Sequence, residues 1–384
     1  MTYSVYQPWD PLKVCVVGKS YPPDFYNFIE NKRLQQLFKQ IATETAEDFD
    51  FLADTLTRLG VKVIRPNVPE VQIDQYLTNN KRIPGPVSMT PRDQMIMIGD
   101  KFLLFPYNMT SIKSSGRDLE ETVDEKNQLS EKTESIDWWK PIIDEVKSQG
   151  NQIISKEHRA ILERIPANGI TRIGKDIYFG FLEIETEYAG SLPEFADPEL
   201  IEFQKTILGE YRHHWIKSNG HLDGMFCPVK PGLILSIFDT HNYAETFPGW
   251  EVVYLEGESW FKVKDFLDLK KKNAGRWWIK GREHDDELIN YVETWLGDWV
   301  GYCEESVFDV NILVVDQQNV IVSGYNKTAF DAFERHGITA HICPIRHRYF
   351  WDGGVHCSTL DLHREGVPQD FFPDRTCNRS IVSK

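Results

Sequence analysis

One local pattern recurs four times in this chain of 384 residues and constrains its fold more than any other feature. An amphipathic segment leads to a glycine, and β-branched or aromatic residues follow, as in DTLTRLGVKVIRP around Gly60. The other copies surround Gly150, Gly249 and Gly337, at a spacing of about 90 residues. Glycine readily takes the positive φ that closes a helix, and the residues after it are typical of a buried strand. Each copy therefore predicts a helix, a glycine cap and a strand.

Apolar runs before or between these copies predict further strands. They occur at residues 13–18, 94–105, 176–181, 232–238 and 311–324. Two of the runs contain turn sequences, IGDK and VDQQN, and are predicted to be hairpins. The repeated order is hairpin, helix, strand. This order favours one closed α/β assembly of similar units over a doubly wound sheet.

Two segments do not follow the repeat. Residues 110–140 are polar and highly charged, and residues 257–300 are rich in lysine, tryptophan and acidic residues. Neither resembles a linker between independent domains, and we interpret both as surface excursions. The sequence therefore predicts one domain that spans residues 1–384.

Composition excludes several classes of protein. The chain is 41% hydrophobic and has eleven tryptophans, enough for a large core. Its net charge of -15 argues against binding to nucleic acid or an anionic membrane, which both require clustered lysine and arginine. This excess of acidic over basic residues is compatible with a small cationic substrate. The first residues show no signal or transit sequence and no apolar run approaches ~18 residues, so we predict a soluble, cytoplasmic protein.

The cysteines form no disulfide framework. They are scattered without a CxxC pair, which predicts free thiols that are mostly inert core residues. Their positions are 15, 227, 303, 343, 357 and 377.

Three polar clusters interrupt the apolar strand pattern. Arg92 and Asp93 precede a predicted strand in SMTPRDQMIMIGD. His221 and Asp223 are two residues apart in SNGHLDGMFCPVKPG, so on an extended segment both side chains would point to one face. Cys357 lies in GGVHCSTLDLHREG, where glycines allow the backbone to approach a ligand closely.

Each cluster has more than one interpretation. Arg92 and Asp93 could form a surface ion pair or a turn and cap, and the His221 and Asp223 pair could be structural. Cys357 could be a buried hydrophobe or a nucleophile, since a catalytic cysteine needs a nearby histidine and a lowered pKa. A zinc site is a further alternative, although no CxxC or HExxH spacing supports it. Its ligands would be His221, Asp223, Cys357 and either His356 or His363.

Together the three clusters resemble the amidinotransferases, a family of the guanidino-group-modifying or pentein superfamily. The similar stretches are TPRDQMIMIGDKFLLFP, HLDGMFCPVKPGLILS and GGVHCSTLDLHREG, with FDVNILVVDQQNVIVSG before the last, in the family's order over about residues 8–370. The resemblance implies a five-bladed pseudo-symmetric α/β propeller, a pentein fold closed as a single domain. It also implies that the active site lies at the central axis.

The resemblance implies a mechanism that fits guanidino chemistry. A guanidinium is planar and always protonated, and paired carboxylates can hold it. Asp93 and Asp223 would bind it, Cys357 would attack its central carbon, and His221 would protonate the departing amine. An acceptor amine would then resolve the amidino-cysteine intermediate. The family reaction uses no cofactor, and the sequence has no metal or dinucleotide motif.

The sequence departs from the family at the expected partner of the histidine. The family places an aspartate before its third strand region, whereas this chain reads RIPANGITRIGKDIYF, with Pro166 at that position. Glu163 is a nearby replacement, and Asn168 could hold the imidazole of His221 without a charge. Loss of the carboxylate would lower the basicity of His221.

Further departures concern the substrate. Thr240 or His241 replaces an arginine that holds the donor's α-carboxylate in the family, and Asp309 replaces a serine in the predicted pocket. Together with Arg92, Asp309 is a predicted substrate-binding residue. Loss of a cation and gain of an anion favour a donor without a free α-carboxylate, or one with an extra amine.

Three functions fit these observations. We predict transfer of an amidino group from a guanidino donor, such as arginine, to an amine acceptor. The alternatives are a guanidine hydrolase or deiminase with the same Cys357 and His221, and a non-catalytic guanidino-binding protein. Many members of the family are dimers, so the resemblance allows a homodimer, but no segment identifies an interface.

Overall fold

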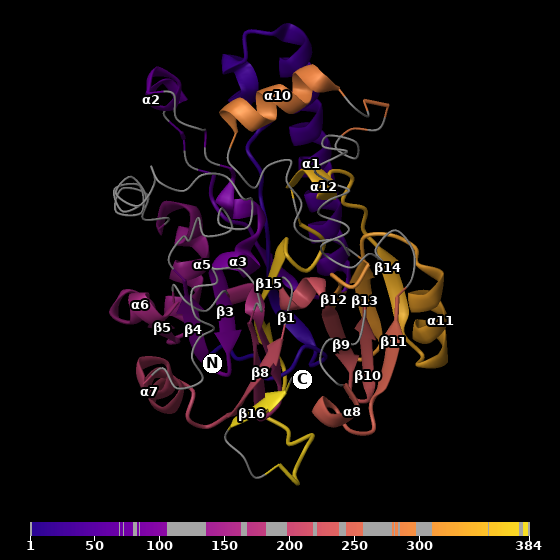
Figure 1. Ribbon diagram of the computed structural model, residues 1–384. Coiled ribbons are helices and arrows are strands. Elements are labelled where there is room, and N and C mark those ends of the chain that lie inside the picture. The colour runs from indigo at the N-terminus through magenta and orange to yellow at the C-terminus, as the bar shows by residue number, and fades with distance from the viewer. Residues whose placement is uncertain are drawn as a thin grey trace, which may run out of the picture.

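The computed structural model describes residues 2–375 and 379–382, apart from gaps at 69, 72, 80–82, 84, 106–135, 163–166, 182–197, 218–220, 238–242, 256–278, 280, 283–284, 297–308 and 352. Five small mixed sheets are arranged around a common axis (Figure 1). In every sheet a central strand pairs antiparallel with an inner strand and parallel with an outer strand. The five-bladed α/β propeller implied by the resemblance is therefore confirmed.

The five blades share one order of strands, from inner to outer. The strands are β15 (Thr359–Arg364), β1 (Leu12–Val17) and β2 (Lys62–Ile64); β3 (Met95–Ile98), β4 (Lys101–Leu104) and β5 (Gln152–Ile154); β6 (Ile170–Ile173), β7 (Asp176–Phe181) and β8 (Arg212–Lys217), extended by β16 (Arg379–Val382); β9 (Phe226–Lys230), β10 (Leu233–Ser236) and β11 (Glu251–Tyr254); β12 (Leu313–Val314), β13 (Asn319–Val322) and β14 (Thr339–Ile342). All five predicted strand runs are confirmed as strands or hairpins.

A helix joins the central and outer strands of each blade. These helices are α1 (Lys32–Arg58), α5 (Ile136–Ser148), α7 (Pro198–Ile207), α8 (Tyr243–Thr246) and α11 (Lys327–Arg335). The shorter elements between blades include α2 (Ile73–Thr78), α3 (Pro91–Gln94), α6 (Arg159–Leu162), α10 (Asp286–Trp295) and α12 (Arg348–Trp351). The 3-10 turns are η1 (Pro23–Phe28), η2 (Val87–Met89), η4 (Lys156–His158), η5 (Ala167–Gly169) and η6 (Leu222–Gly224).

The glycine caps take the predicted conformation. Gly60, Gly150, Gly249 and Gly337 have φ values of 81°, 79°, 80° and 66°. A Cβ at any of them would meet nothing within 4 Å, so the positive φ and not crowding favours glycine there. The remaining blade has the same order of helix, glycine and strand, from α7 through Gly209 to β8. Unlike the other four glycines, Gly209 does not have a positive φ.

The ring closes between the two ends of the chain. The inner strand β15 pairs antiparallel with β1, with Cys15 opposite Asp361 and Val17 opposite Thr359. The first blade therefore takes its inner strand from the C-terminal part of the chain. This pairing places Cys357, just before β15, next to residues from the other blades.

The long helix α1 supports the first and last blades. Asn31 caps its first turn by accepting hydrogen bonds from the backbone N–H groups of Arg33 and Leu34. Its buried face, which includes Leu34, Phe38 and Phe49, contributes to a core with apolar residues of β1, β12 and β13. The helix thus anchors the two blades at which the ring closes.

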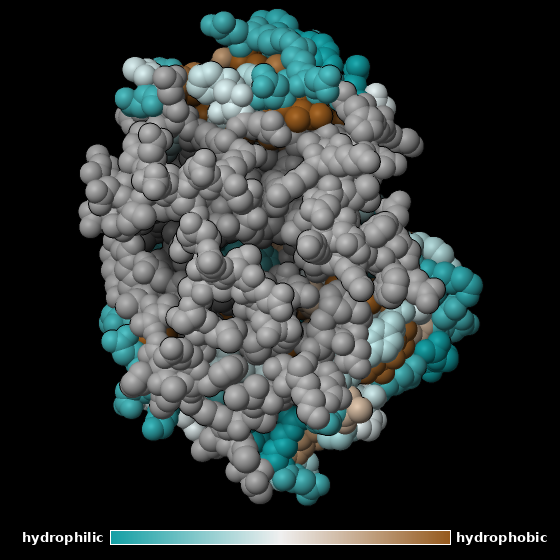
Figure 2. All heavy atoms as spheres, viewed as in Figure 1, coloured by the Kyte–Doolittle hydropathy of each residue, from teal (hydrophilic) through white to brown (hydrophobic). Residues whose placement is uncertain are grey.

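Part of the segment predicted at residues 257–300 packs against α1. The rings of Tyr291 in α10 and Phe38 are 5.5 Å apart, and Arg33 forms ion pairs with Asp285 and Glu287. Figure 2 shows hydrophilic side chains over α11 and at the end of the molecule where α10 meets α1. Most of the segment at 110–140 lies outside the described residues. No helix of the described chain is long and apolar enough to cross a membrane.

Candidate active site

A short turn precedes the inner strand of every blade and carries a polar side chain. In four blades this residue lies two positions before the strand, and in the fourth blade it lies three before it. The five residues are Asp93, Asn168, Asp223, Asn311 and Cys357. Because the inner strands converge at the axis, the five turns bring these side chains together. Each of the five blades therefore contributes one polar residue to the site.

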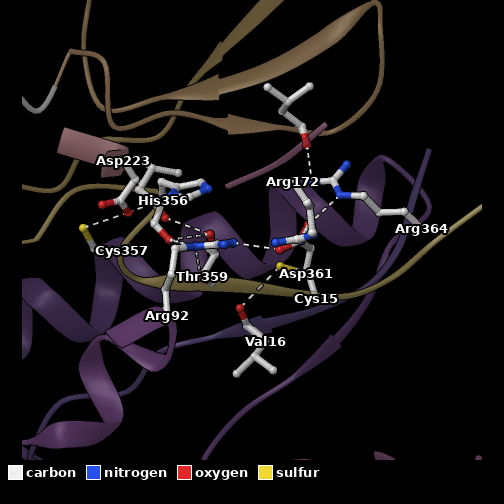
Figure 3. Close-up of polar contacts among 12 residues, drawn as sticks. Cys15, Val16, Arg92, Arg172, Asp223, His356, Cys357, Thr359, Asp361 and Arg364 are labelled. Atoms are coloured by element: carbon white, nitrogen blue, oxygen red, sulfur yellow. Dashed lines mark hydrogen bonds and ion pairs between the residues drawn. The ribbon is translucent and has the colours of Figure 1, made fainter. Parts of the chain in front are cut away.

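Cys357 lies between a hydrogen-bond donor and a carboxylate, and Figure 3 shows its sulfur facing the carboxylate of Asp223. Asn311 Nδ2 donates to its Sγ at 3.0 Å, and Sγ donates to Asp223 Oδ2 at 3.5 Å. The residue is 1% exposed. A Cβ on Gly354 would lie 2.6 Å from Asn311 Oδ1, so this glycine is needed for the turn to approach Asn311.

Asn311 was not predicted from the sequence. Its side chain is fully buried, and its Oδ1 accepts from the backbone N–H groups of His356 and Cys357, at 2.9 and 3.1 Å. In the sequence it reads as part of the apolar run VNILVV. Its position two residues before the inner strand, like that of Asp93, is the signal that could have identified it.

Asp223 is tied to His356, the residue next to Cys357. The His356 Nδ1 and Asp223 Oδ2 atoms are 2.7 Å apart. Burial, together with the positive charge of Arg92, lowers the pKa of His356, which favours a neutral imidazole that donates from Nδ1. Burial alone would raise the pKa of Asp223, but the hydrogen bond from His356 and nearby positive charge, including that of Arg92, outweigh it and the net pKa is lowered. The second oxygen, Oδ1, is buried without a hydrogen-bond partner among the described residues.

The backbone around His221 differs from our prediction. His221 precedes η6, and Asp223 lies within this 3-10 turn, so the two residues are not on one extended segment. The positive charge of His221 would favour the ionised forms of both Asp93 and Asp223. The imidazole therefore lies in the field of two carboxylates from different blades.

Asn168 does not hold His221 as predicted. Its Nδ2 donates to Asp93 Oδ1 at 2.8 Å, and its Oδ1 is buried with no partner among the described residues. Burial raises the pKa of Asp93, although the charge of His221 and the Asn168 hydrogen bond act in the opposite direction. The other predicted partner, Glu163, lies outside the described residues, as does Pro166.

Arg92 lies behind the Cys357 turn and is 4% exposed. Its Nε donates to the carbonyl oxygens of His356 and Thr359, both at 3.1 Å, and its Nη2 donates to Asp361 Oδ1 at 2.9 Å. It is neither a surface ion pair nor a turn cap. These contacts show that Arg92 holds the turn, and its contact with substrate stays a prediction.

A buried ion network continues along the axis from Arg92. Asp361 also accepts from Arg172 and Arg364, at 2.5 and 2.7 Å (Figure 3). Burial opposes ionisation of Asp361, but the three guanidinium groups hold its pKa well below the usual range. A cavity of about 40 Å³ adjoins this network and is lined by residues of β6, β9, β12 and β15 together with Arg92.

Of the remaining predicted substrate residues, the structure describes Asp309. Asp309 is two residues before Asn311, and its Oδ2 accepts from Asn326 Nδ2 at 2.9 Å. Thr240 and His241 lie outside the described residues. Within the described part of the chain, no group of three or more His, Cys, Asp or Glu side chains could hold a metal ion.

Three other cysteines match the prediction of inert thiols. Cys15, Cys227 and Cys343 are buried and unpaired in disulfides. Burial raises the pKa of Cys15 and of Cys227 to about 12, and it also raises the pKa of Cys343. A raised pKa removes the thiolate that a nucleophile needs. Cys303 and Cys377 lie outside the described residues.

Comparison with known proteins agrees with this architecture. No family model matches the chain. Glycine amidinotransferase from Xenopus tropicalis is 23% identical over 96% of this chain and 84% of its own length. L-arginine:L-lysine amidinotransferase from Pseudomonas savastanoi pv. phaseolicola is 20% identical over 96% of both. The solved inosamine-phosphate amidinotransferase from Streptomyces griseus superposes with a TM-score of 0.60 at 18% identity, over 96% of this chain and 99% of that one.

The fold is that of the amidinotransferases. The resemblance inferred from the three polar clusters is thus confirmed along almost the whole chain. A second solved structure, the N-terminal domain of a cyanobacterial arginine dihydrolase, has a TM-score of 0.50 at 12% identity, over 91% of this chain and 98% of that one. The amidinotransferase fold therefore hosts more than one reaction of guanidino compounds.

Proposed function

We propose that the protein is an amidinotransferase that moves an amidino group from a guanidino donor to an amine acceptor. The observation that carries this proposal is the contact set of Cys357, whose sulfur lies between the Asn311 amide and the Asp223 carboxylate. A thiol beside a buried carboxylate is suited to a cationic electrophile, because the carboxylate binds the cation next to the sulfur. The full-length similarity to named amidinotransferases supports the same reaction.

The donor guanidinium would bind between Asp93 and Asp223. Two buried oxygens in this region, Asp223 Oδ1 and Asn168 Oδ1, have no partner among the described residues. A buried acceptor without a donor costs free energy, which a guanidinium N–H group would recover. Cys357 is 1% exposed, so the donor must displace the residues that cover its sulfur.

Two balanced steps complete the transfer. The Cys357 thiolate forms an S–C bond to the guanidino carbon, the C–N bond to the leaving amine breaks, and His221 protonates that amine. The acceptor amine then forms a new C–N bond, His221 takes its proton, and the S–C bond breaks to restore the thiolate. A cyanobacterial arginine dihydrolase with this fold has been solved covalently bound to a reaction intermediate, which supports the covalent route.

In the family, an aspartate at the position of Pro166 supplies a negative charge to the histidine. Asp93 would supply this charge to His221 here. The charge of His221 lowers the pKa of Asp93, so the two groups interact. The Asn168 amide orients Asp93 by donating to its Oδ1. In this arrangement Asp93 would serve both the donor cation and the protonated form of His221.

The donor and acceptor are separate questions. The relatives are named for glycine, lysine and inosamine-phosphate, so similar folds use chemically different acceptor amines. Asp309, together with Thr240 or His241 in place of an arginine, favours a donor without a free α-carboxylate. We expect agmatine to exceed arginine as donor, and a strong preference for arginine would refute this part of the proposal.

A panel of guanidino donors and amine acceptors tests the reaction. We expect a transferred amidino group in wild type, a loss of at least about 1000-fold in Cys357→Ala, and near-normal activity in Cys343→Ser as control. Full activity of Cys357→Ala would exclude the mechanism. The fold shared with an arginine dihydrolase supports hydrolysis as second candidate. Release of ammonia or urea without an acceptor would favour that candidate.

A non-catalytic role has its own test. Covalent labelling of Cys357 by a haloacetamidine, with protection by a guanidino compound, would argue for a reactive site over a binding module.

The sequence makes further predictions about the whole protein. They are a single domain over residues 1–384, a cytoplasmic location, a homodimer, and the absence of nucleic-acid and membrane partners. Size-exclusion chromatography with light scattering would decide the oligomeric state.

A further inference from the structure

The side chain of Asn311 makes four hydrogen bonds, three of them to the turn that carries Cys357. Its Nδ2 donates to Cys357 Sγ at 3.0 Å and to the backbone oxygen of Asp223 at 3.3 Å. Its Oδ1 accepts from the backbone N–H groups of His356 and Cys357. Both amide hydrogens and both lone pairs are therefore used. One side chain joins the turn before β9 to the turn before β15.

The orientation of this amide follows from its neighbours. Exchange of the nitrogen and oxygen positions would direct the NH₂ group at two backbone N–H donors and lose all four hydrogen bonds. The donor must therefore face Sγ. Gly354 makes this approach possible, since a Cβ there would lie 2.6 Å from Asn311 Oδ1.

The sulfur is subject to two opposing influences. Asp223 Oδ2, at 3.5 Å, accepts the thiol proton and repels a thiolate. Asn311 Nδ2–H can donate to a thiolate, and a hydrogen bond to a charged group is stronger than one between neutral groups. When a donor cation binds, it neutralises Asp223 but leaves the Asn311 contact in place. Asn311 is then the fixed donor to the ionised sulfur.

We propose that Asn311 is a catalytic residue that stabilises the thiolate of Cys357 and fixes the direction of its attack. This inference rests on the proposed function only in taking Cys357 as the nucleophile. It predicts that the donor hydrogen bond changes the ionisation of Cys357, and that this change can be measured without any substrate.

Ultraviolet absorbance of the thiolate near 240 nm, read as the difference from Cys357→Ser across pH, tests the proposal. For Asn311→Ala we expect the midpoint of thiolate formation to rise by about one pH unit or more. For Asn311→Asp we expect a larger rise, because a carboxylate then faces the sulfur. Gly354→Ala should give a rise in the same direction by pushing Asn311 away, so the test does not depend on one variant that fails to fold.

Asn151→Asp is the matched control. Asn151 is also buried and joins distant backbone groups, those of Tyr3 and Asp100, but it lies in the second blade away from the sulfur. We expect it to lower the melting temperature and leave the midpoint unchanged. An unchanged midpoint in all three site variants, or an equal shift in the control, would overturn the proposal.

The outcome is separable from that of the proposed function. If wild type transfers no amidino group but the midpoint depends on Asn311, the proposed function fails and the inference on the thiolate stands. If transfer occurs and the midpoint does not depend on Asn311, the reverse holds.

Discussion

Two polar clusters share the propeller axis, and they differ in how fully their hydrogen bonds are satisfied. Around Asp361, three arginines direct donors at one carboxylate, and both of its oxygens are used. Around Cys357, the Asp223 and Asn168 side chains each retain a buried oxygen without a partner among the described residues. A network whose carboxylate oxygens are all used, here called saturated although Arg172 Nε has no partner among the described residues, stabilises a structure. Unsatisfied acceptors cost stability and are suited to bind a ligand. The first cluster holds the blades, and the second is available for chemistry.

The largest expected effect is on the saturated cluster. Asp361→Asn removes the charge that pairs with Arg92, Arg172 and Arg364, all at most 5% exposed. Loss of one partner from a buried ion network costs about 3–5 kcal/mol. We expect the free energy of unfolding in urea to fall by this amount.

Asp370→Asn is the matched control for that loss. Asp370 also pairs with two cations, Arg212 and Lys175, but its side chain is 27% exposed. Solvent screens such a pair, so its loss costs about 1 kcal/mol or less. Equal losses in the two variants would remove the distinction between a buried anchor and a surface ion pair.

The next effect is expected at the unsatisfied cluster and falls mainly on activity. Asp223→Asn can still accept from His356 but can no longer neutralise a guanidinium. We expect kcat/KM of the donor to fall about 100-fold, because charge-assisted hydrogen bonds are lost. The free energy of unfolding should fall by less than in Asp361→Asn, because Asp223 is hydrogen-bonded to one imidazole whereas Asp361 is paired with three guanidinium groups. An equal loss of stability in the two variants would show that Asp223, like Asp361, mainly stabilises the fold.

The contrast also explains which parts were predictable from the sequence. Gly60, Gly150, Gly249 and Gly337 act locally, at the end of a helix, and their pattern gave four blades. The fifth copy, TILGEYRHHWIK around Gly209, was not recognised, and Gly209 does not take the positive φ of the other four. The closure of β15 on β1 joins segments almost 350 residues apart, which no local pattern reports.

The site was predicted where residue chemistry is distinctive and missed where it is not. Cys357 and Asp223 were identified by chemical type together with the family resemblance. Asn311 was missed because an asparagine in an apolar run reads as strand, and its role depends on contacts across blades. The structural role of Arg92 was missed because its partners are carbonyl oxygens and a carboxylate distant in sequence.

A smaller effect is expected at Asn168. Asn168→Asp would place a second carboxylate 2.8 Å from Asp93 Oδ1, where an amide now donates. Two carboxylates at this distance cannot both ionise readily, so the pKa of Asp93, already raised by burial, would rise further. We expect about tenfold lower activity at pH 7 and a pH–rate profile whose acid limb moves up by about one unit. Higher activity in Asn168→Asp would show that His221 prefers a carboxylate at this position.

The smallest expected effect is on the pH dependence of stability. Burial lowers the pKa of His356 in the folded chain, where it faces Asp223, Arg92 and Asp361. Below about pH 6.5 the histidine binds a proton in the unfolded chain but stays neutral in the folded chain, until the pH reaches its lower folded-state pKa. The free energy of unfolding contributed by His356 is therefore present above pH 6.5 and is lost as the pH falls toward the folded pKa.

Replacement of the imidazole should flatten this decline. We expect His356→Gln to reduce the loss of unfolding free energy between pH 7 and 5 by about 1 kcal/mol, within the limit of 1.36 kcal/mol per proton and pH unit. Asp361 is held ionised far into acid by its three arginines, so the saturated cluster should contribute nothing to this pH window. An unchanged slope in His356→Gln would mean that His356 is protonated in the folded protein, and Asp223 would then already have a cationic partner before any donor arrives.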